Sequence, residues 1–299
     1  MKLYDIISQM AIRLNDYLKE TFGCKVYKLA IDGGFTCPNR DGSLSDKGCI
    51  FCSGYGSGDF AESRNLSITE QIEKAKEKVS KKIKDGKYIA YFQAFTNTYA
   101  PVEELKTKYI EALSHPDIVA LSIATRPDCL PDDVLQLLDE LNHIKPIWIE
   151  LGLQTIHPTT AAYIRRYYDL SVYEKAVSNL HSIGINVITH VILGLPGETE
   201  QMMLESVDYV GKLGSDGIKL QLLHVIKGTD LESEYSEGKF KCLEMEEYVS
   251  LIKKCINILP DNIIIHRMTG DGAKKTLVAP LWSSNKKVVI NALNKALSC

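Results

Sequence analysis

Residues 24–52 read CKVYKLAIDGGFTCPNRDGSLSDKGCIFC. The first eight residues are mostly apolar, which predicts a β-strand over 24–31. The remainder is a glycine-rich loop that contains three cysteines. Five later runs also have strand character, and several of them are almost wholly apolar, as is typical of parallel strands buried on both faces. They span residues 87–94, 117–124, 146–153, 185–193 and 216–223.

Helical patterns separate these runs. Ser67 and Glu70 have the spacing of a capping box, and apolar residues recur on one face behind them, which predicts a helix over 68–83. Similar helices are predicted over 101–114, 131–142, 171–183 and 199–213. Six strand–helix units in series predict an α/β fold, in which a parallel sheet curls into an open, partial (βα)6 barrel of the TIM type.

The two ends of the chain are expected to add to this barrel. Four charged residues interrupt the apolar run at the N-terminus, which predicts an amphipathic helix over residues 1–23; they are Asp5, Arg13, Asp16 and Lys19. The barrel itself is assigned to residues 24–225. A seventh strand-like run at 262–267 and a last helix from about residue 286 predict that residues 226–299 form a C-terminal α/β extension packed on the barrel.

Composition limits the location and the partners of the protein. A formal net charge of −3 and an isoelectric point near 6.2 exclude a uniformly basic nucleic-acid binder, and nothing indicates DNA binding. The N-terminus does not resemble a secretion signal, and no run approaches the ~20 apolar residues that span a bilayer. We therefore expect a cytoplasmic protein without membrane contact. In that reducing compartment, close-set cysteines bind metal or act in catalysis.

The three loop cysteines have the spacing of a metal site. Eleven residues separate Cys37 from Cys49, and two separate Cys49 from Cys52. Three thiolates can bind three corners of a 4Fe–4S cluster and leave the fourth iron open to a small ligand. A zinc knuckle is the alternative, but zinc requires four ligands and the nearest histidine is His115. The other cysteines lack cluster spacing and are expected to be buried or incidental thiols: Cys24, Cys129, Cys242, Cys255 and Cys299.

Three motifs together resemble those of radical S-adenosylmethionine (SAM) enzymes. They are Thr-Cys-Pro-Asn-Arg-Asp-Gly (36–42), Cys-Ile-Phe-Cys (49–52) and Arg-Met-Thr-Gly-Asp-Gly (267–272). The resemblance is to the branch that includes the catalytic subunit of Elongator and a family of short bacterial proteins. It implies a 4Fe–4S cluster held by Cys37, Cys49 and Cys52, SAM as the second cofactor, and a one-electron reductant such as flavodoxin or ferredoxin.

The resemblance also implies a SAM site along the ends of the strands. Phe51 is expected to contact the adenine. After the second strand, relatives have a glycine-rich turn for the amino group of SAM. This chain has Gln93, Thr96 and Asn97 there, which are expected to contribute side chains instead.

Later strands are expected to complete that site. Gln154 matches the position that bonds the ribose, and Arg166 matches an arginine that pairs with the SAM carboxylate through its fork geometry. Gly194 and Leu195 belong to a turn that flanks the adenine in relatives. This chain departs from the family pattern at Ala124 and His190, where relatives often have acidic residues. Glu150 is a candidate to replace one of them, and His190 remains a candidate SAM contact.

Residues that act on the substrate are less clear from the sequence. His224 follows the sixth strand, at the end of the barrel where active sites usually lie. A buried structural histidine, with its hydrogen bonds satisfied inside the protein, is an equal alternative. Tyr99 and Arg126 lie in similar loops. These three residues are the catalytic candidates.

The resemblance to the Elongator subunit points to tRNA as the substrate, and to the 5-substituent of its wobble uridine. That subunit also has an acetyltransferase domain, for which 299 residues leave no room. We therefore expect remodelling of an existing side chain, for example 5-carboxymethylaminomethyluridine to aminomethyluridine. Radical modification of a peptide or small metabolite is the alternative reaction. A non-catalytic Fe–S or zinc RNA-binding module is the alternative from another class.

Overall fold

The computed structural model describes residues 12–80, 86–270, 272 and 274–298. Much of the predicted N-terminal helix and the end of the helix predicted over 68–83 lie outside these residues. The described part of the N-terminal segment begins with strand β1 (Ile12–Arg13), followed by helix α1 (Leu14–Phe22). The helix prediction is therefore wrong for Ile12 and Arg13, because these residues pair with a strand from the far end of the chain.

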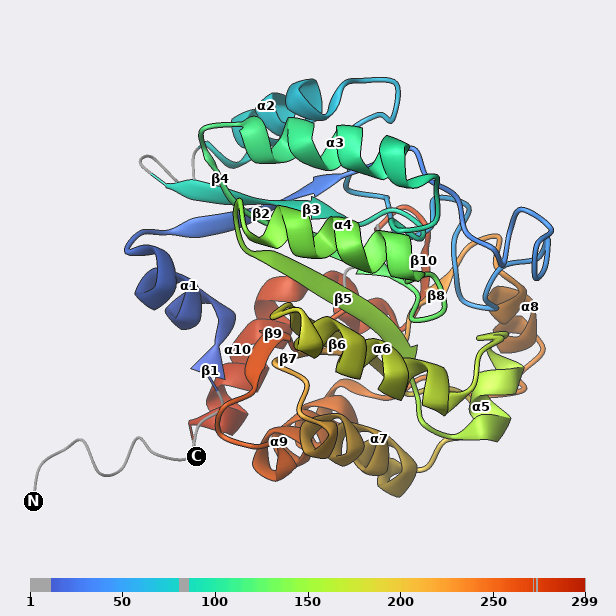
Figure 1. Ribbon diagram of the computed structural model, residues 1–299. Coiled ribbons are helices and arrows are strands. Elements are labelled where there is room, and N and C mark those ends of the chain that lie inside the picture. Colours follow the sequence, from blue (N-terminus) through green and yellow to red (C-terminus); the bar gives the residue numbers. More distant parts are fainter. Residues whose placement is uncertain (1–11, 81–85, 271, 273, 299) are drawn as a thin grey trace, which may run out of the picture.

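The parallel sheet is confirmed. In the described residues its eight strands have the order β1-β9-β7-β6-β5-β4-β3-β2, where β9 is Ile264–Arg267. All neighbours are parallel, and the sheet is strongly curled (Figure 1). The six predicted strands are β2 (Val26–Ile31), β3 (Lys87–Phe92), β4 (Ile118–Thr125), β5 (Ile147–Gln154), β6 (Asn186–Leu193) and β7 (Gly217–Leu222).

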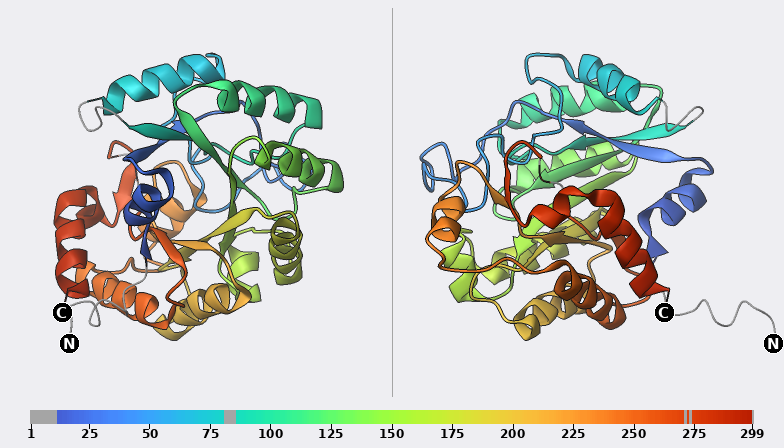
Figure 2. Two further views of the ribbon diagram at one scale, coloured as in Figure 1. Left: turned by 60° about the vertical axis from the view of Figure 1, so that its left-hand side comes forward. Right: turned by 180° about the vertical axis from the view of Figure 1, so that it is seen from behind.

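The helices form an outer ring around the sheet (Figure 2). The predicted ones are α2 (Ile68–Val79), α3 (Val102–Ser114), α4 (Asp132–Asn142), α6 (Leu170–Ser182) and α7 (Glu200–Leu213). The capping box of α2 is formed as expected: Ser67 Oγ accepts from the backbone of Glu70, and the Glu70 carboxylate accepts from the backbone of Ser67. The main core lies between the sheet and this ring, and Tyr109 and Tyr173 are fully buried in it.

The C-terminal part of the chain continues the barrel sheet. Strand β9 (Ile264–Arg267) pairs in parallel with the free edge of β7, with Ile265 opposite Ile218. The other side of β9 pairs with β1, so the two edges of the sheet lie at β1 and β2. The remaining elements are α5 (Pro158–Tyr163), β8 (Val225–Ile226), α8 (Asp230–Ser236), α9 (Met245–Ile258), β10 (Leu277–Ala279), a 3-10 turn (Leu281–Ser284) and α10 (Lys286–Leu297). The division at residues 225 and 226 stays a prediction.

The amino-terminal end of the barrel is closed by apolar side chains. Leu18 of α1 packs there against Val26, Trp148 and Ile188 from three strands. The loops that follow the strands lie at the other end, so the fold leaves that end available for a site. Among the helices of the described residues, none combines the length and apolar character needed to cross a bilayer.

Candidate active site

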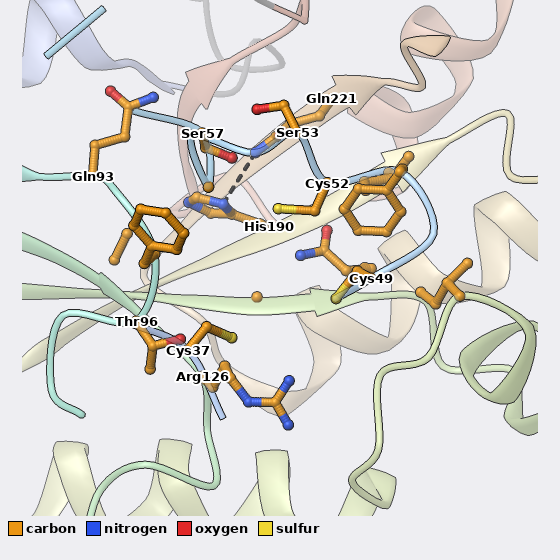
Figure 3. A pocket seen from close by; sticks show the side chains of 18 of the residues that line it. Cys37, Cys49, Cys52, Ser53, Ser57, Gln93, Thr96, Arg126, His190 and Gln221 are labelled. Atoms are coloured by element: carbon orange, nitrogen blue, oxygen red, sulfur yellow. Dashed lines mark hydrogen bonds between the residues drawn. The ribbon is translucent and has the colours of Figure 1, made fainter. Parts of the chain in front are cut away.

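The cysteine loop lies over the carboxyl ends of the strands. Cys37, Cys49 and Cys52 all line one cavity of about 260 Å³, and their thiols turn toward a common region (Figure 3). Strand ends supply the rest of the lining. The predicted cofactor residues found in it are Phe51, Gln93, Thr96, Glu150, Gln154, Arg166 and His190.

Asn39 fixes the position of the middle cysteine. Its side chain is fully buried, and Nδ2 donates to Cys49 Sγ at 3.4 Å and to the Arg165 carbonyl at 2.8 Å. The loop is thereby tied to the segment after α5. Sequence reasoning missed this residue, although it lies inside the motif at 36–42.

Arg40 braces the last cysteine. Its Nη2 donates to the carbonyls of Cys52 and Ser53, both at 2.7 Å. Gly48 is required beside it: its φ is +74°, and a Cβ there would lie 3.1 Å from the Arg40 guanidinium. A glycine therefore permits both the turn and the close approach of the arginine.

The cysteines have the chemistry of an iron–sulfur site. Burial raises the pKa of Cys49 to about 12, with nearby Cys52 and Cys37 adding to the effect, and burial also raises the pKa of Cys52. Such thiols ionise when a metal supplies the balancing positive charge. In the described part of the chain, no three His, Cys, Asp or Glu side chains converge around a single ion. A cluster makes a different demand, because each thiolate binds a separate iron. The donor set fits a 4Fe–4S cluster.

A fourth thiol lies beside the cysteine loop. Cys129 is buried, and burial raises its pKa to about 12. Cys129 lines a second cavity, together with Pro38 and Tyr99. Tyr99 was a catalytic candidate, but the structure places it in that second cavity, where its hydroxyl hydrogen-bonds Ser43 Oγ at 2.8 Å.

Gln154 presents an unsatisfied acceptor at the end of β5. It has a φ of +69°, and its buried Oε1 accepts no hydrogen bond within the described structure. Gly152 leaves the space for the amide, since a Cβ there would lie 2.9 Å from Gln154 Nε2. A buried acceptor without a donor is rare in folded proteins, and a ligand hydroxyl would satisfy it.

Three predicted cofactor residues lie outside the cavity lining. Asn97 is fully buried, and its Nδ2 donates to the carbonyls of Phe92 and Ala124, so it ties the ends of β3 and β4 together. Gly194 adopts a φ of +92° in a turn. Leu195 is packed into an apolar cluster that includes residues of the cysteine loop. Contact of these three residues with SAM stays a prediction.

Arg166 lies at the cavity with much of its fork already engaged. Nη1 donates to the carbonyls of Thr155 at 2.6 Å and Leu153 at 3.3 Å, while Nε donates to that of Tyr168 at 3.1 Å. Burial lowers the pKa of Arg166. The side chain therefore braces the backbone after β5 as well as facing the cavity.

Two of the catalytic candidates line the cavity. Arg126 is held by Asp128, to which Nε and Nη2 donate at 2.9 and 2.7 Å. His224 lies against the motif at 267–272. A Cβ added to Gly270 would lie 2.5 Å from the His224 ring, and one added to Gly272 would lie 2.8 Å from it. The two glycines of that motif therefore let the C-terminal segment lie directly against His224.

A charged layer lies inside the barrel below these residues. The carboxylate of Glu150 is fully buried and accepts from Lys28 Nζ at 2.6 Å, Ser122 Oγ at 2.6 Å and His190 Nε2 at 2.7 Å. Lys219 Nζ also donates to it. Each partner comes from a different strand. Glu150 is thus saturated by protein donors, which favours a charge-balancing role over direct contact with SAM.

The charges of this layer follow from its burial. Burial alone would raise the pKa of Glu150, but the ammonium groups of Lys219 and Lys28 hold it well below its usual value. Burial and Lys219 lower the pKa of His190 to about 4, and burial lowers that of Lys219 to about 7. Near neutral pH, Glu150 is therefore ionised and His190 is neutral. Sequence reasoning missed both lysines, although a lone lysine in an apolar strand is a signal that could have found them.

Comparison with known families agrees with this geometry. The model described as the Radical SAM superfamily matches residues 37–210, and the Radical_SAM C-terminal domain matches residues 215–298. The chain belongs to the radical SAM superfamily. It is a radical SAM enzyme, and this family uses a 4Fe–4S cluster and SAM as cofactors. The predicted family, enzyme class and cofactors are confirmed.

Individual relatives differ in how much of the chain they share. "Uncharacterized protein YtqA" of Bacillus subtilis (strain 168) is 50% identical over 284 residues, which are 95% of this chain and 88% of that protein. A "tRNA uridine(34) acetyltransferase" of Methanocaldococcus jannaschii is 28% identical over 171 residues, 56% of this chain and 31% of that protein. The solved structure of Methanocaldococcus infernus Elp3 with an N-terminal deletion has a TM-score of 0.67 at 19% identity. It covers 90% of this chain and 63% of that one, and it supports the fold.

Proposed function

We propose that this radical SAM enzyme remodels the 5-substituent of the wobble uridine in tRNA, converting 5-carboxymethylaminomethyluridine to aminomethyluridine. The observation that carries the proposal is the single cavity shared by the cysteines and by polar side chains from the barrel interior. A cavity of this size can admit a small side chain. The name of the relative that acts on tRNA uridine 34 supports the choice of substrate.

Within the cavity we assign roles to the residues at the strand ends. Phe51 is proposed to contact the adenine of SAM, and Gln154 Oε1 to accept from a ribose hydroxyl. Gln93 and Thr96 are proposed to meet the amino group, and Arg166 the carboxylate. When bound to Cys37, Cys49 and Cys52, the reduced cluster would supply the electron that cleaves SAM to methionine and a 5′-deoxyadenosyl radical. Hydrogen abstraction from the carboxymethyl CH2, return of one electron to the oxidised cluster and hydrolysis of the resulting iminium by water would release the carboxymethyl group as glyoxylate and leave the aminomethyl form.

The remaining residues position the substrate. Arg126, held by Asp128, and His224, held against Gly270 and Gly272, are proposed to contact the uridine side chain. Both side chains are fixed by their surroundings, and a fixed contact reduces the freedom that the substrate must lose before reaction. We also propose that a flavodoxin or ferredoxin reduces the cluster in the cytoplasm.

Exposed lysines of the C-terminal segment are the proposed tRNA contacts. Lys274 and Lys275 are exposed and follow Gly272, which lines the cavity. Lysines of α2 are less suitable, because Lys76 and Lys78 are engaged by carboxylates. Lys286 and Lys287, also exposed, form a second candidate pair.

The test is conversion of modified tRNA by the reconstituted enzyme. We expect mass spectrometry of digested tRNA to show loss of 5-carboxymethylaminomethyluridine and gain of aminomethyluridine, in an amount that depends on SAM and reductant. A deletion strain should accumulate the carboxymethylaminomethyl form. Unchanged tRNA nucleosides in both experiments would contradict the function and favour a peptide or metabolite substrate.

The tRNA surface is tested separately. Lys274→Glu combined with Lys275→Glu should weaken tRNA binding and flatten its salt dependence, because each lost phosphate contact reduces the slope of log affinity against log salt by about 0.7–0.9. Lys175→Glu with Lys212→Glu makes the same charge change on helices α6 and α7 and should have little effect. Equal tRNA binding by the two double variants would place the RNA surface elsewhere.

A further inference from the structure

The side-chain nitrogen of Asn39 donates to two acceptors, one of which is a cysteine sulfur. Asn39 is 0% exposed, and its Nδ2 donates to Cys49 Sγ at 3.4 Å and to the Arg165 carbonyl at 2.8 Å. A backbone carbonyl can only accept, so the contact with Arg165 decides which end of the amide is the nitrogen. Oδ1 has no donor among the described residues, and the orientation is therefore held by Nδ2. The group that faces the Cys49 sulfur is thus an N–H donor.

Backbone contacts hold Asn39 in this position. Its carbonyl accepts from the Gly48 N–H at 2.6 Å, and the Arg40 N–H donates to the Cys37 carbonyl at 2.8 Å across the same turn. Arg165, whose carbonyl receives the amide, has a φ of +60°. That conformation is uncommon outside glycine and persists where the surrounding structure requires it. The position of the amide is therefore set by the protein itself.

An N–H directed at a ligand sulfur changes the energy of reducing a cluster. Reduction adds one negative charge to the cluster, and a donor to a ligand sulfur stabilises the reduced form more than the oxidised form. The surroundings strengthen the effect, because a buried site screens a dipole less than water does. The burial that raises the pKa of Cys49 to about 12 shows that this sulfur lies in such a site.

We propose that Asn39 is a positioning residue that raises the reduction potential of the cluster through the hydrogen bond from Nδ2 to Cys49 Sγ. The inference concerns the cofactor chemistry of the superfamily to which the chain belongs, and it does not depend on the identity of the substrate. A purely structural role for Asn39 would support the loop and leave the potential unchanged.

The test measures the midpoint potential of the cluster in the anaerobically reconstituted full-length protein, without SAM. Electron paramagnetic resonance follows the reduced cluster during a redox titration, and iron and sulfide content normalises the signal. Asn39→Leu keeps the approximate size of the side chain and removes the donor. We expect the ratio of reduced to oxidised cluster at a given potential to fall about three- to tenfold, the range for one hydrogen bond, which lowers the midpoint by about 28–59 mV.

A matched control makes the same substitution away from the site. Asn142 lies at the amino-terminal end of the barrel, where its side chain donates to the Gly184 carbonyl at 3.3 Å and accepts from the Ile147 N–H at 2.9 Å. Asn142→Leu should keep the wild-type midpoint. An unchanged midpoint in Asn39→Leu, at a cluster content near that of the wild type, overturns the proposal.

Two further arms cover a variant that assembles too little cluster to titrate. Asn39→Ser, whose side chain is too short to reach the sulfur, should show the same fall in midpoint, and a wild-type midpoint there overturns the proposal. The wild-type protein is also labelled with nitrogen-15 at the asparagine side-chain amides. Pulsed electron paramagnetic resonance should detect a hyperfine coupling between that nitrogen and the reduced cluster. If no such coupling is present, the hydrogen bond is not made to the cluster and the proposal fails, whatever the variants show.

Discussion

The cysteine loop and the charged layer line the same cavity but are built in opposite ways. The loop places its three thiols within residues 37–52, and its supports Asn39, Arg40 and Gly48 come from the same stretch. The charged layer takes one side chain from each of several strands, from Lys28 on β2 to Lys219 on β7. The cysteine loop is thus determined mainly by one short stretch of sequence. The charged layer forms only when the strands have assembled into the barrel.

This difference predicts different responses to mutation. A residue of the loop is expected to act mainly on the cluster, since the loop itself supplies the three thiols and several of the side chains that support them. A residue of the layer acts on the stability of the whole barrel, because it joins strands that are distant in sequence. Buried charges make that dependence strong, since removing one member leaves the others without balance.

The largest expected effect is on the cluster. Cys37→Ala, Cys49→Ala and Cys52→Ala should each abolish the cluster and SAM cleavage, because each removes the ligand of one iron. Cys129→Ala is the sharp control: it removes a buried thiol that lines another cavity, and cluster content and cleavage should persist. Iron and sulfide analysis with product chromatography measures both. SAM cleavage by Cys49→Ala at the wild-type rate would contradict the assignment of Cys49 as a cluster ligand.

The next largest effect is on stability. Glu150→Gln should lower the free energy of unfolding by about 3–5 kcal/mol, because it leaves Lys28 and Lys219 buried beside a neutral amide. Glu140→Gln removes an exposed carboxylate, 51% accessible and paired with Lys106, and should cost no more than about 1 kcal/mol. Denaturant unfolding of the two variants gives the comparison. Similar losses would mean that the layer does not stabilise the barrel.

Arg166 lines the same cavity, and the effect of replacing it should be intermediate. Arg166→Ala should weaken SAM binding by about 1.5–3 kcal/mol, the range for hydrogen bonds to charged groups. Arg166→Lys should restore only part of this, since lysine lacks the planar fork that also braces Thr155 and Leu153. Equilibrium dialysis with labelled SAM measures it, and circular dichroism checks the fold. Wild-type affinity in both variants would assign the SAM carboxylate to another residue.

The strands could be predicted because they are buried on both faces. The run at 87–94 became β3 (Lys87–Phe92), and 185–193 became β6 (Asn186–Leu193). The pairing of β9 with β7 could not be predicted, because it depends on which sheet edge the returning chain meets. Helix α9 (Met245–Ile258) was missed although Tyr248, Leu251, Ile252 and Cys255 give it a clear apolar face. Helix α8 has seven residues, too few for an apolar repeat that would predict a helix.

The same contrast applies to the candidate site. Cysteine spacing is visible in the sequence, so the predicted ligands could be named before the structure. Asn97 was expected to face SAM, but its amide ties β3 to β4, and only three-dimensional packing decides between those uses. Lys28 and Lys219 lie in apolar strands. The carboxylate with which both lysines pair, that of Glu150, is determined by the order of the strands in the sheet.

The smallest expected effect is a pH dependence that isolates one member of the charged layer. The pKa of His190 is about 4 in the folded protein, against 6.5 for an ordinary histidine. Between these values the unfolded chain binds more protons than the folded one, so stability must fall as the pH drops from about 6.5 toward 4. The contribution is fully present above pH 6.5. From about pH 7.5 to about pH 5 the loss should be about 1.5–2 kcal/mol.

His190→Gln removes that titration while keeping an amide donor near Glu150. The free energy of unfolding of this variant should therefore change less over the same pH range, and the difference between the two curves should develop below pH 6.5. Glu150 itself titrates well below its usual value, so it acts at lower pH and does not account for the difference. Chemical denaturation at a series of pH values supplies both curves. Parallel curves would mean that His190 is protonated in the folded protein, and the charged layer would then hold a further cation beside Glu150.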